Sequence, residues 1–97
     1  MTNLWLDDCR PAPDGWTWCK TVPEAMILLA TDKVFQASLD HDLGLHMPTG
    51  YDLCLWMAET GHWPNITPYV HSNNAMYSGK MSRLIWRYFG TKQGEPK

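Results

Sequence analysis

The sequence predicts an α/β fold in which a four-stranded parallel sheet, with the strand order 2-1-3-4, carries about three helices. Short apolar runs alternate along the chain with segments of helical periodicity, which is typical of parallel sheets with right-handed crossovers. The run at residues 4–6 is apolar without alternation, as in a strand that is buried on both faces. Pro68 lies inside the last apolar run and removes a ladder donor, which places that strand at a sheet edge.

The N-terminal half of the chain is expected to supply two strands and one helix. After the first strand, residues 9–15 contain two prolines and a glycine and are predicted to form a loop. Residues 16–19 alternate like a strand, with both tryptophans on one side. A helix is predicted over residues 22–32, because Thr21 and Glu24 match a capping box at its start.

The C-terminal half is expected to supply two more strands and two more helices. Residues 37–39 form a third apolar run and predict a buried strand. A helix is predicted over residues 49–60, and Gly61 is a plausible stop for it. Residues 66–70 predict the fourth strand. Residues 75–88 predict the last helix, because apolar side chains recur there at helical spacing.

Length and composition restrict the class of protein. The chain has 97 residues, enough for one domain, expected over residues 1–90 with a flexible polar tail at 91–97. Eight Lys and Arg against ten Asp and Glu give a net charge of -2, so no cationic excess signals nucleic-acid binding. No apolar run approaches the roughly 20 residues that span a bilayer. Three scattered cysteines without a CxxC pair favour a reducing, cytoplasmic setting.

Reactive side chains follow three of the four predicted strands. In a parallel sheet the carboxyl ends of the strands meet at one edge, where ligands bind. Carboxylates gathered at that edge repel each other unless a cation lies between them, and oxygen ligands favour Mg²⁺ or Mn²⁺. The candidate metal ligands are Asp7, Asp8 and Asp40, with Asp42 as a further or outer ligand.

Histidines and phosphate-binding groups are expected at the same edge. Because a free imidazole titrates near neutral pH, His71 and His41 are candidates for a general acid and a general base. Arg10, Ser72 and Asn74 are candidates for binding phosphate oxygens. Structural interpretations stay open for several of these residues. A single histidine is often a hydrogen-bonded structural residue, and Ser72 with Asn74 can simply cap the final helix.

Three cations recur along one side of the last predicted helix. Lys80, Arg83 and Arg87 stand at positions i, i+3 and i+7. Most stripes of this kind are solvated helix faces, and we interpret this one in the same way, although Lys80 is near enough to the helix start to reach an anionic ligand. His46 and His62 fall in loops without a matching context and are expected at the surface.

The residues at the strand ends resemble those of response-regulator receiver domains. Such domains carry an acidic pair after strand one, a phospho-accepting Asp after strand three and a Ser or Thr after strand four. Asp7 and Asp8, Asp40, and Ser72 occupy these positions. Two features depart from the receiver pattern. The fifth strand with its lysine is missing, and the helix between strands one and two is reduced to a proline-rich loop.

Four spaced motifs resemble a diverged group of such domains, the cyclic-phosphate processing receiver domain. The motifs are LDDCRP at 6–11, SLDHDLG at 38–44, TGYD at 49–52 and HSNN at 71–74. The resemblance implies a truncated flavodoxin-like or receiver-like fold with three layers. It also implies an activity that concerns a small phosphorylated ligand containing a cyclic phosphate.

Three hypotheses for the function follow. The first is a metal-dependent phosphoesterase that hydrolyses a cyclic phosphate or cyclic nucleotide, for example a signalling cyclic nucleotide or an RNA 2′,3′-cyclic phosphate. The second is a sponge or sensor that binds a cyclic nucleotide without turnover. The third is an atypical stand-alone phosphorylation receiver, which the missing lysine disfavours. The sequence specifies neither the oligomeric state nor the substrate.

Overall fold

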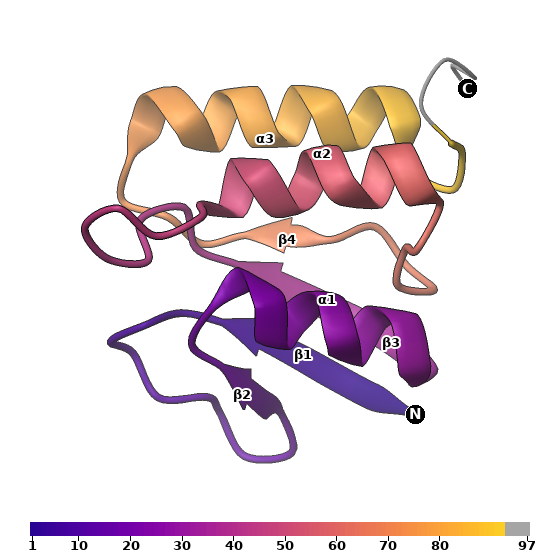
Figure 1. Cartoon of the computed structure of the whole chain (residues 1–97), viewed down its shortest axis with the longest axis horizontal. Helices are drawn as coiled ribbons and strands as arrows, with labels where there is room; N and C mark the ends of the chain where they lie inside the picture. Colours follow the sequence, from indigo (N-terminus) through magenta and orange to yellow (C-terminus); the bar gives the residue numbers. More distant parts are fainter. Residues whose placement is uncertain (93–97) are drawn as a thin grey trace.

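The four strands pair side by side and parallel, in the order β2-β1-β3-β4 (Figure 1). The structure, a computed structural model, describes residues 1–92. Its strands are β1 (Thr2–Leu6), β2 (Thr17–Cys19), β3 (Val34–Leu39) and β4 (Tyr69–Val70), and its helices are α1 (Val22–Thr31), α2 (Gly50–Thr60) and α3 (Ala75–Tyr88). The predicted strand order and the predicted number of helices are confirmed.

The carboxyl ends of the strands are level with one another, which brings the segments after them to one edge of the sheet. Leu6 pairs with Cys19 on β2 and with Leu39 on β3. The ladder then continues one step beyond the strands. Asp7 N–H donates to the Cys19 carbonyl at 3.1 Å, and Asp40 N–H donates to the Leu6 carbonyl at 2.9 Å. Asp7, the first residue after β1, is therefore held by β2, and Asp40, the first residue after β3, is held by β1.

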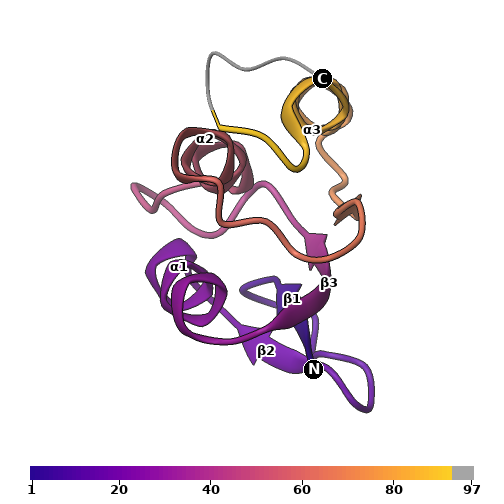
Figure 2. The same ribbon diagram turned by 90° about the vertical axis from the view of Figure 1, so that its right-hand side faces the viewer.

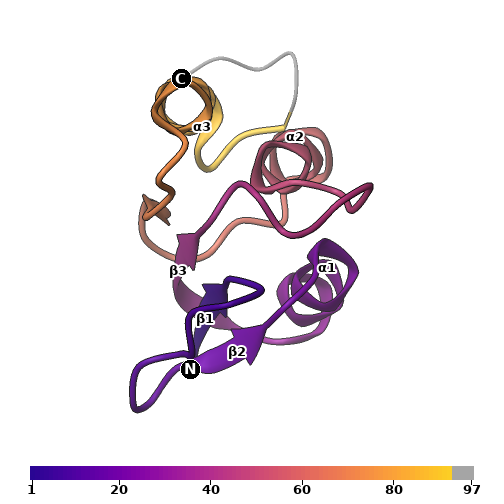
Figure 3. The same cartoon turned by 90° about the vertical axis from the view of Figure 1, so that its left-hand side faces the viewer.

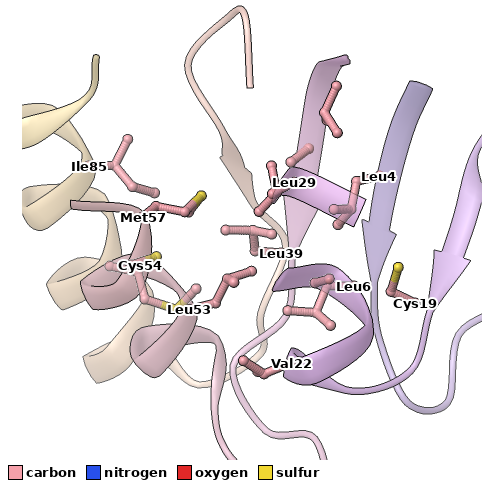
Figure 4. Close-up of a cluster of buried hydrophobic side chains, with 14 of the residues drawn as sticks. Leu4, Leu6, Cys19, Val22, Leu29, Leu39, Leu53, Cys54, Met57 and Ile85 are labelled. Carbon is pink, nitrogen blue, oxygen red and sulfur yellow. The ribbon is translucent and has the colours of Figure 1, made fainter. Parts of the chain in front are cut away.

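Two helices, α1 and α2, lie over the same face of the sheet, and α3 packs beside α2 on that side at the β4 edge, as the two side views show (Figures 2 and 3). The core fills the space between this helical layer and the sheet (Figure 4). Side chains from both layers are fully buried there, among them Leu4, Leu6, Leu39, Leu53 and Met57. Burial of this apolar surface is the main stabilising contribution to the fold.

The layering differs from the predicted three layers, because in the described part of the chain no helix covers the other face of the sheet (Figures 2 and 3). Right-handed crossovers explain this result. The connections from β2 to β3 and from β3 to β4 advance across the sheet in the same direction, so their helices share one face. Only the step from β1 to β2 runs in reverse, and that connection is a loop without a helix.

The ends of the helices agree with the sequence signals. Thr21 and Thr49 are the N-caps of α1 and α2, and Thr49 forms a complete capping box with Asp52. Gly61 ends α2 with φ 78°, a left-handed conformation that glycine adopts without steric cost. In the described part of the chain, no helix combines the length and apolar character needed to cross a membrane.

Two predicted segments end up shorter or only partly described. The fourth strand was expected at 66–70, but β4 has two residues. Pro68 lacks the N–H of a ladder donor, and β4 is at the sheet edge as predicted. The predicted flexible tail begins at Thr91, but this residue is held in place. The indole Nε1 of Trp63 donates to the Thr91 carbonyl at 2.7 Å. Residues 93–97 lie outside the described part of the chain.

Candidate functional site

Three carboxylates from two strand ends meet at the carboxyl edge of the sheet. One oxygen each from Asp7, Asp8 and Asp40 lies within 4.8 Å of the other two. Asp7 is buried, while Asp8 and Asp40 are half-buried. Three anions at this separation repel one another strongly in a partly desolvated site. The all-oxygen donor set fits a hard divalent cation such as Mg²⁺ or Mn²⁺, which would remove this repulsion.

Asp7 is held by hydrogen bonds to both of its oxygens. Oδ1 accepts from the backbone N–H of Cys9 at 2.9 Å and of Arg10 at 2.8 Å. Oδ2 accepts from His71 Nε2 at 3.0 Å. Burial alone would raise the pKa of Asp7, but the two backbone donors and His71 outweigh it, so the pKa lies below its ordinary value. Two donors fill Oδ1, while Oδ2 keeps one lone pair with which to bind a cation.

His71 lies on the uncovered face of the sheet and connects Asp7 to β3. Its Nδ1 is 2.7 Å from Ser38 Oγ, and its ring stacks on Trp5 with the centroids 4.0 Å apart. Because a carboxylate only accepts, Nε2 carries the proton that bonds Asp7. In the neutral ring Nδ1 then accepts from the Ser38 hydroxyl. The small side chain of Ser38 leaves room for the imidazole to cross β3 and reach β1.

Two tryptophans hold the loop that carries the acidic pair. Trp18 Nε1 donates to the Asp7 carbonyl at 2.7 Å, and Trp5 Nε1 donates to the Arg10 carbonyl at 2.9 Å. Both indoles lie on neighbouring strands, where Trp5 and Trp18 are register partners. The sheet therefore fixes the backbone on both sides of Asp8, and this positions the acidic pair before any ligand binds.

A cavity of about 420 Å³ opens above the three carboxylates. Its lining consists of Asp7, Asp8, Cys9, Arg10, Asp40, Asp42, Gly44 and Asn73. Three of these residues, Cys9, Gly44 and Asn73, are not among the site residues that the sequence predicts. Asn73 stands inside the HSNN motif, between two residues that were selected, and its place there is the one signal that pointed to it.

Arg10 is the cation of this cavity, as its sequence position suggested. Its Nε lies 4.0 Å from Asp7 Oδ2, and its side chain remains 47% exposed. The guanidinium also donates to the His71 carbonyl at 3.4 Å. With only these weak contacts on the protein side, most of the five N–H donors remain directed at solvent and are able to bind a phosphate.

Neither of the two histidines that are predicted to be catalytic lines the cavity. His41 is buried, its ring stacks on Tyr77 with the centroids 4.1 Å apart, and its Nδ1 is 2.9 Å from Asp42 Oδ1. Consecutive residues in extended backbone face opposite ways, so His41 turns away when Asp40 faces the cavity. Asp42 itself lines the cavity with a side chain that is 68% exposed.

Ser72 and Asn74 are engaged at the start of α3. Asn74 is the N-cap, and its Oδ1 accepts from Tyr77 N–H at 3.2 Å. Ser72 Oγ accepts from Asn74 N–H at 3.1 Å. These contacts correspond to the capping interpretation, and neither residue is among those that line the cavity.

The negative charge of the cavity acts on Cys9. Asp8 is the strongest influence, and together with burial, Asp7 and Asp40 it raises the pKa of the Cys9 thiol above its ordinary value. The thiol is exposed, and no disulfide forms among the three cysteines. Cys9 therefore reports on the charge of the site without being a ligand within it.

Comparison with known proteins supplies one match. The family model described as "Cyclic-phosphate processing Receiver domain" matches residues 2–87. That range contains all four strands and all but the last residue of α3. Neither the curated proteins nor the solved structures contain a match to this chain.

Proposed function

Because the chain belongs to the family of cyclic-phosphate processing receiver domains, we propose that it is a metal-dependent phosphoesterase that hydrolyses a cyclic phosphate or cyclic nucleotide. The observation that carries this proposal is the meeting of three carboxylates, from Asp7, Asp8 and Asp40, within 4.8 Å at the floor of a polar cavity. The donor set suits Mg²⁺ or Mn²⁺, and a bound ion would polarise a phosphoryl oxygen and offset the carboxylate charge.

In this proposal, the side chains around the cavity bind either the metal ion or the phosphate. Asp7, Asp8 and Asp40 hold the cation, and Asp42 at the rim serves as an outer ligand. Arg10 binds a non-bridging phosphate oxygen and so orients the ring for attack from the opposite side. In the reaction, water adds to phosphorus, one ring P–O bond breaks, and the leaving oxygen takes up a proton to yield a phosphomonoester.

We assign His71 a positioning role in this reaction. Both of its ring nitrogens are engaged, one by Asp7 and the other by Ser38. Carboxylates that ligate metals are themselves held by hydrogen bonds from surrounding groups, and the loss of such a partner weakens metal binding. Proton transfer by His71 would require one of these two hydrogen bonds to break first.

The proposal is tested by a substrate screen with a matched set of variants. Cyclic mononucleotides, cyclic dinucleotides and RNA ending in a 2′,3′-cyclic phosphate are incubated with the protein and Mg²⁺, Mn²⁺ or EDTA. We expect a ring-opened monoester from one class, only with metal. We also expect loss of this product in Asp8→Asn and Asp40→Asn, and retention in Asp14→Asn, whose exposed carboxylate is absent from the cavity lining.

Other outcomes would replace the proposal with one of the alternatives. Tight binding of a cyclic nucleotide that is recovered intact after heating would indicate a sponge or sensor. Incorporation of phosphate at Asp40 from a small phosphodonor would indicate a phosphorylation receiver. Turnover that persists in EDTA would contradict the requirement for metal.

A further inference from the structure

A second cavity, which we call the basic groove, lies on α3 away from the acidic site. It has a volume of about 370 Å³ and is lined by Tyr51, Lys80, Arg83, Leu84, Arg87 and Tyr88. No residue belongs to both this lining and that of the acidic cavity. The three cations are those that recur along the last helix in the sequence, and they are three of the eight Lys and Arg in the chain.

Within residues 1–92, the cations of the basic groove have no acidic partners. No described carboxylate forms an ion pair with Lys80, Arg83 or Arg87. Like charges three and four residues apart on a helix destabilise it, and a Glu or Asp between them would normally compensate. Among residues 1–92 no carboxylate offsets the exposed positive charge of the groove, so an anionic ligand is its natural complement.

Tyrosine rings lie among these cations. Lys80 Nζ is 4.9 Å from the centroid of Tyr77, and the Arg87 guanidinium is 5.4 Å from that of Tyr88. Tyr51 is half-buried and meets Tyr77 edge-on. Positive charges interleaved with aromatic rings are the arrangement by which proteins bind unpaired nucleotides, since every base has a face that stacks.

The spacing of the cations favours an extended ligand over a compact one. Seven residues separate Lys80 from Arg87, which is about 10.5 Å along the axis of α3. The side chains of all three would reach a single phosphate only by bringing three like charges together, whereas an extended anion leaves these charges apart. A strand with successive phosphates, running along the helix, can contact each of them in turn.

We propose that the basic groove binds single-stranded nucleic acid, with backbone phosphates on Lys80, Arg83 and Arg87 and a base on Tyr88. The net charge of the chain gives no sign of such a site, because the acidic cluster at the sheet edge offsets the local positive charge. The proposal does not rest on the phosphoesterase activity, since the two linings are separate. The two helices that line the groove, α2 and α3, both begin at the edge of the sheet that carries the acidic site (Figure 1).

The test measures binding of a fluorescein-labelled eight-nucleotide oligouridylate by anisotropy, in EDTA and at low salt. EDTA removes any contribution of a metal in the acidic site, so failure here and failure of the phosphoesterase proposal are distinguishable. The principal variant is Lys80→Ala/Arg83→Ala/Arg87→Ala. Its matched control is Lys20→Ala/Lys33→Ala/Lys92→Ala, which removes the same charge from exposed positions elsewhere.

We expect the groove variant to bind at least about tenfold more weakly, while the control stays within about twofold of wild type. The dependence of log K on log salt should also fall by about 2 in the groove variant, because three phosphate contacts are lost. Tyr88→Leu should weaken binding about fivefold or more without changing the salt dependence. Asp40→Asn should bind at least as well as wild type.

Three results would overturn the proposal. The first is no measurable binding by the wild-type protein. The second is equal losses in the groove variant and in its control, which would indicate attraction by charge alone. The third is displacement of the RNA by an oligoglutamate of equal charge at equal concentration, which would assign the groove to an acidic peptide. Circular dichroism of each variant separates loss of binding from loss of fold.

Discussion

His71 Nε2 donates to Asp7 Oδ2 across 3.0 Å, although 64 residues separate the two side chains along the chain. Ser38, on the strand between them, completes the connection at His71 Nδ1. The uncovered face of the sheet thus carries a row of three polar groups that ends at a candidate metal ligand. This row fixes the orientation of the buried Asp7 carboxylate from the uncovered face of the sheet. The free lone pair of Asp7 Oδ2 faces the cavity.

The first prediction concerns His71→Ala. Removing the imidazole leaves the buried oxygen of Asp7 without its side-chain donor, so we expect a loss of about 1–3 kcal/mol in the free energy of unfolding. The affinity for Mn²⁺ should fall about 10–100-fold, because the carboxylate is no longer held in one orientation. Urea denaturation and isothermal titration calorimetry measure the two effects. Ser38→Ala should show the same pattern more weakly.

His71→Gln distinguishes positioning from proton transfer. The glutamine amide is able to donate to Asp7 but does not titrate, so a positioning role predicts recovery of most of the lost metal affinity and turnover. A general acid or base predicts instead a turnover lower by about 10²–10⁴-fold with metal affinity unchanged. The second pattern would contradict the role assigned to His71 here.

The second prediction concerns thermal stability and metal. Mg²⁺ or Mn²⁺ should raise the melting temperature, because an ion that binds only the folded state stabilises it in proportion to log concentration. Asp40→Asn removes one of three mutually repelling charges, so the metal-free protein should melt higher than wild type and respond little to the ion. Differential scanning fluorimetry measures both effects.

Asp14→Asn is the control for that series, because it changes the same charge in an exposed loop. It should keep the full response to metal. If Asp40→Asn responds to Mn²⁺ as wild type does, Asp40 is not a ligand.

Much of the fold was accessible from local patterns. Two observations predict the strand order: Pro68 marks an edge strand, and the reactive side chains after the strands form one site only if those strands are neighbours. The helix starts at Thr21 and Thr49 followed from capping signals that act within one turn. The predicted three layers do not form, because the face that a helix covers depends on the direction in which its right-handed crossover moves along the sheet, which local patterns do not specify.

The site was only partly predictable for a related reason. Topology brings the backbones of Asp7, Asp8 and Asp40 together, so their convergence follows from the fold class. The contact of His71 with Asp7 depends on the small size of Ser38 and on stacking against an indole, which sequence spacing does not encode. Its position after the third strand predicts His41 at the cavity, but spacing does not fix the direction of its side chain, and in the structure the ring packs against Tyr77.

The third prediction concerns Gly50, the first residue of α2. A Cβ at this position would collide with the carbonyl oxygen of Asp40 and lie 2.8 Å from Met81 Cε. The backbone of Asp40 cannot yield without moving its carboxylate. We therefore expect Gly50→Ala to destabilise the protein by at least about 2 kcal/mol and to weaken Mn²⁺ binding together with stability. Urea denaturation and calorimetry measure the two losses.

Gly79→Ala is the matched control within a helix. Its Cβ would lie 3.2 Å from the flexible end of Arg83, which is able to move aside. Replacing an interior helical glycine then stabilises by about 0.5–1 kcal/mol. Equal effects of the two substitutions would show that the close approach of Gly50 to Asp40 is unimportant.

The fourth prediction uses the Cys9 thiol to read the charge of the acidic site. The thiolate is the reactive form, and nearby carboxylates, Asp8 above all, raise the pKa of Cys9. Below that pKa, each unit by which it falls multiplies the thiolate fraction about tenfold. A cation held by Asp7, Asp8 and Asp40 offsets their charge, so Mg²⁺ should lower the pKa of Cys9 and speed its alkylation at pH 8.

The measurement is the rate of alkylation by iodoacetamide against pH, followed by mass spectrometry. The other two thiols contribute little, since burial raises the pKa of Cys19 to about 11 and that of Cys54 to about 12. The midpoint of the profile, and not the rate alone, is compared with and without Mg²⁺, because a bound ion can also shield the sulfur. Asp8→Asn should shift the midpoint to lower pH without any metal and abolish the further shift on adding it. A wild-type midpoint that does not move with Mg²⁺ would mean that no cation binds beside Cys9, and the metal centre would have to be abandoned.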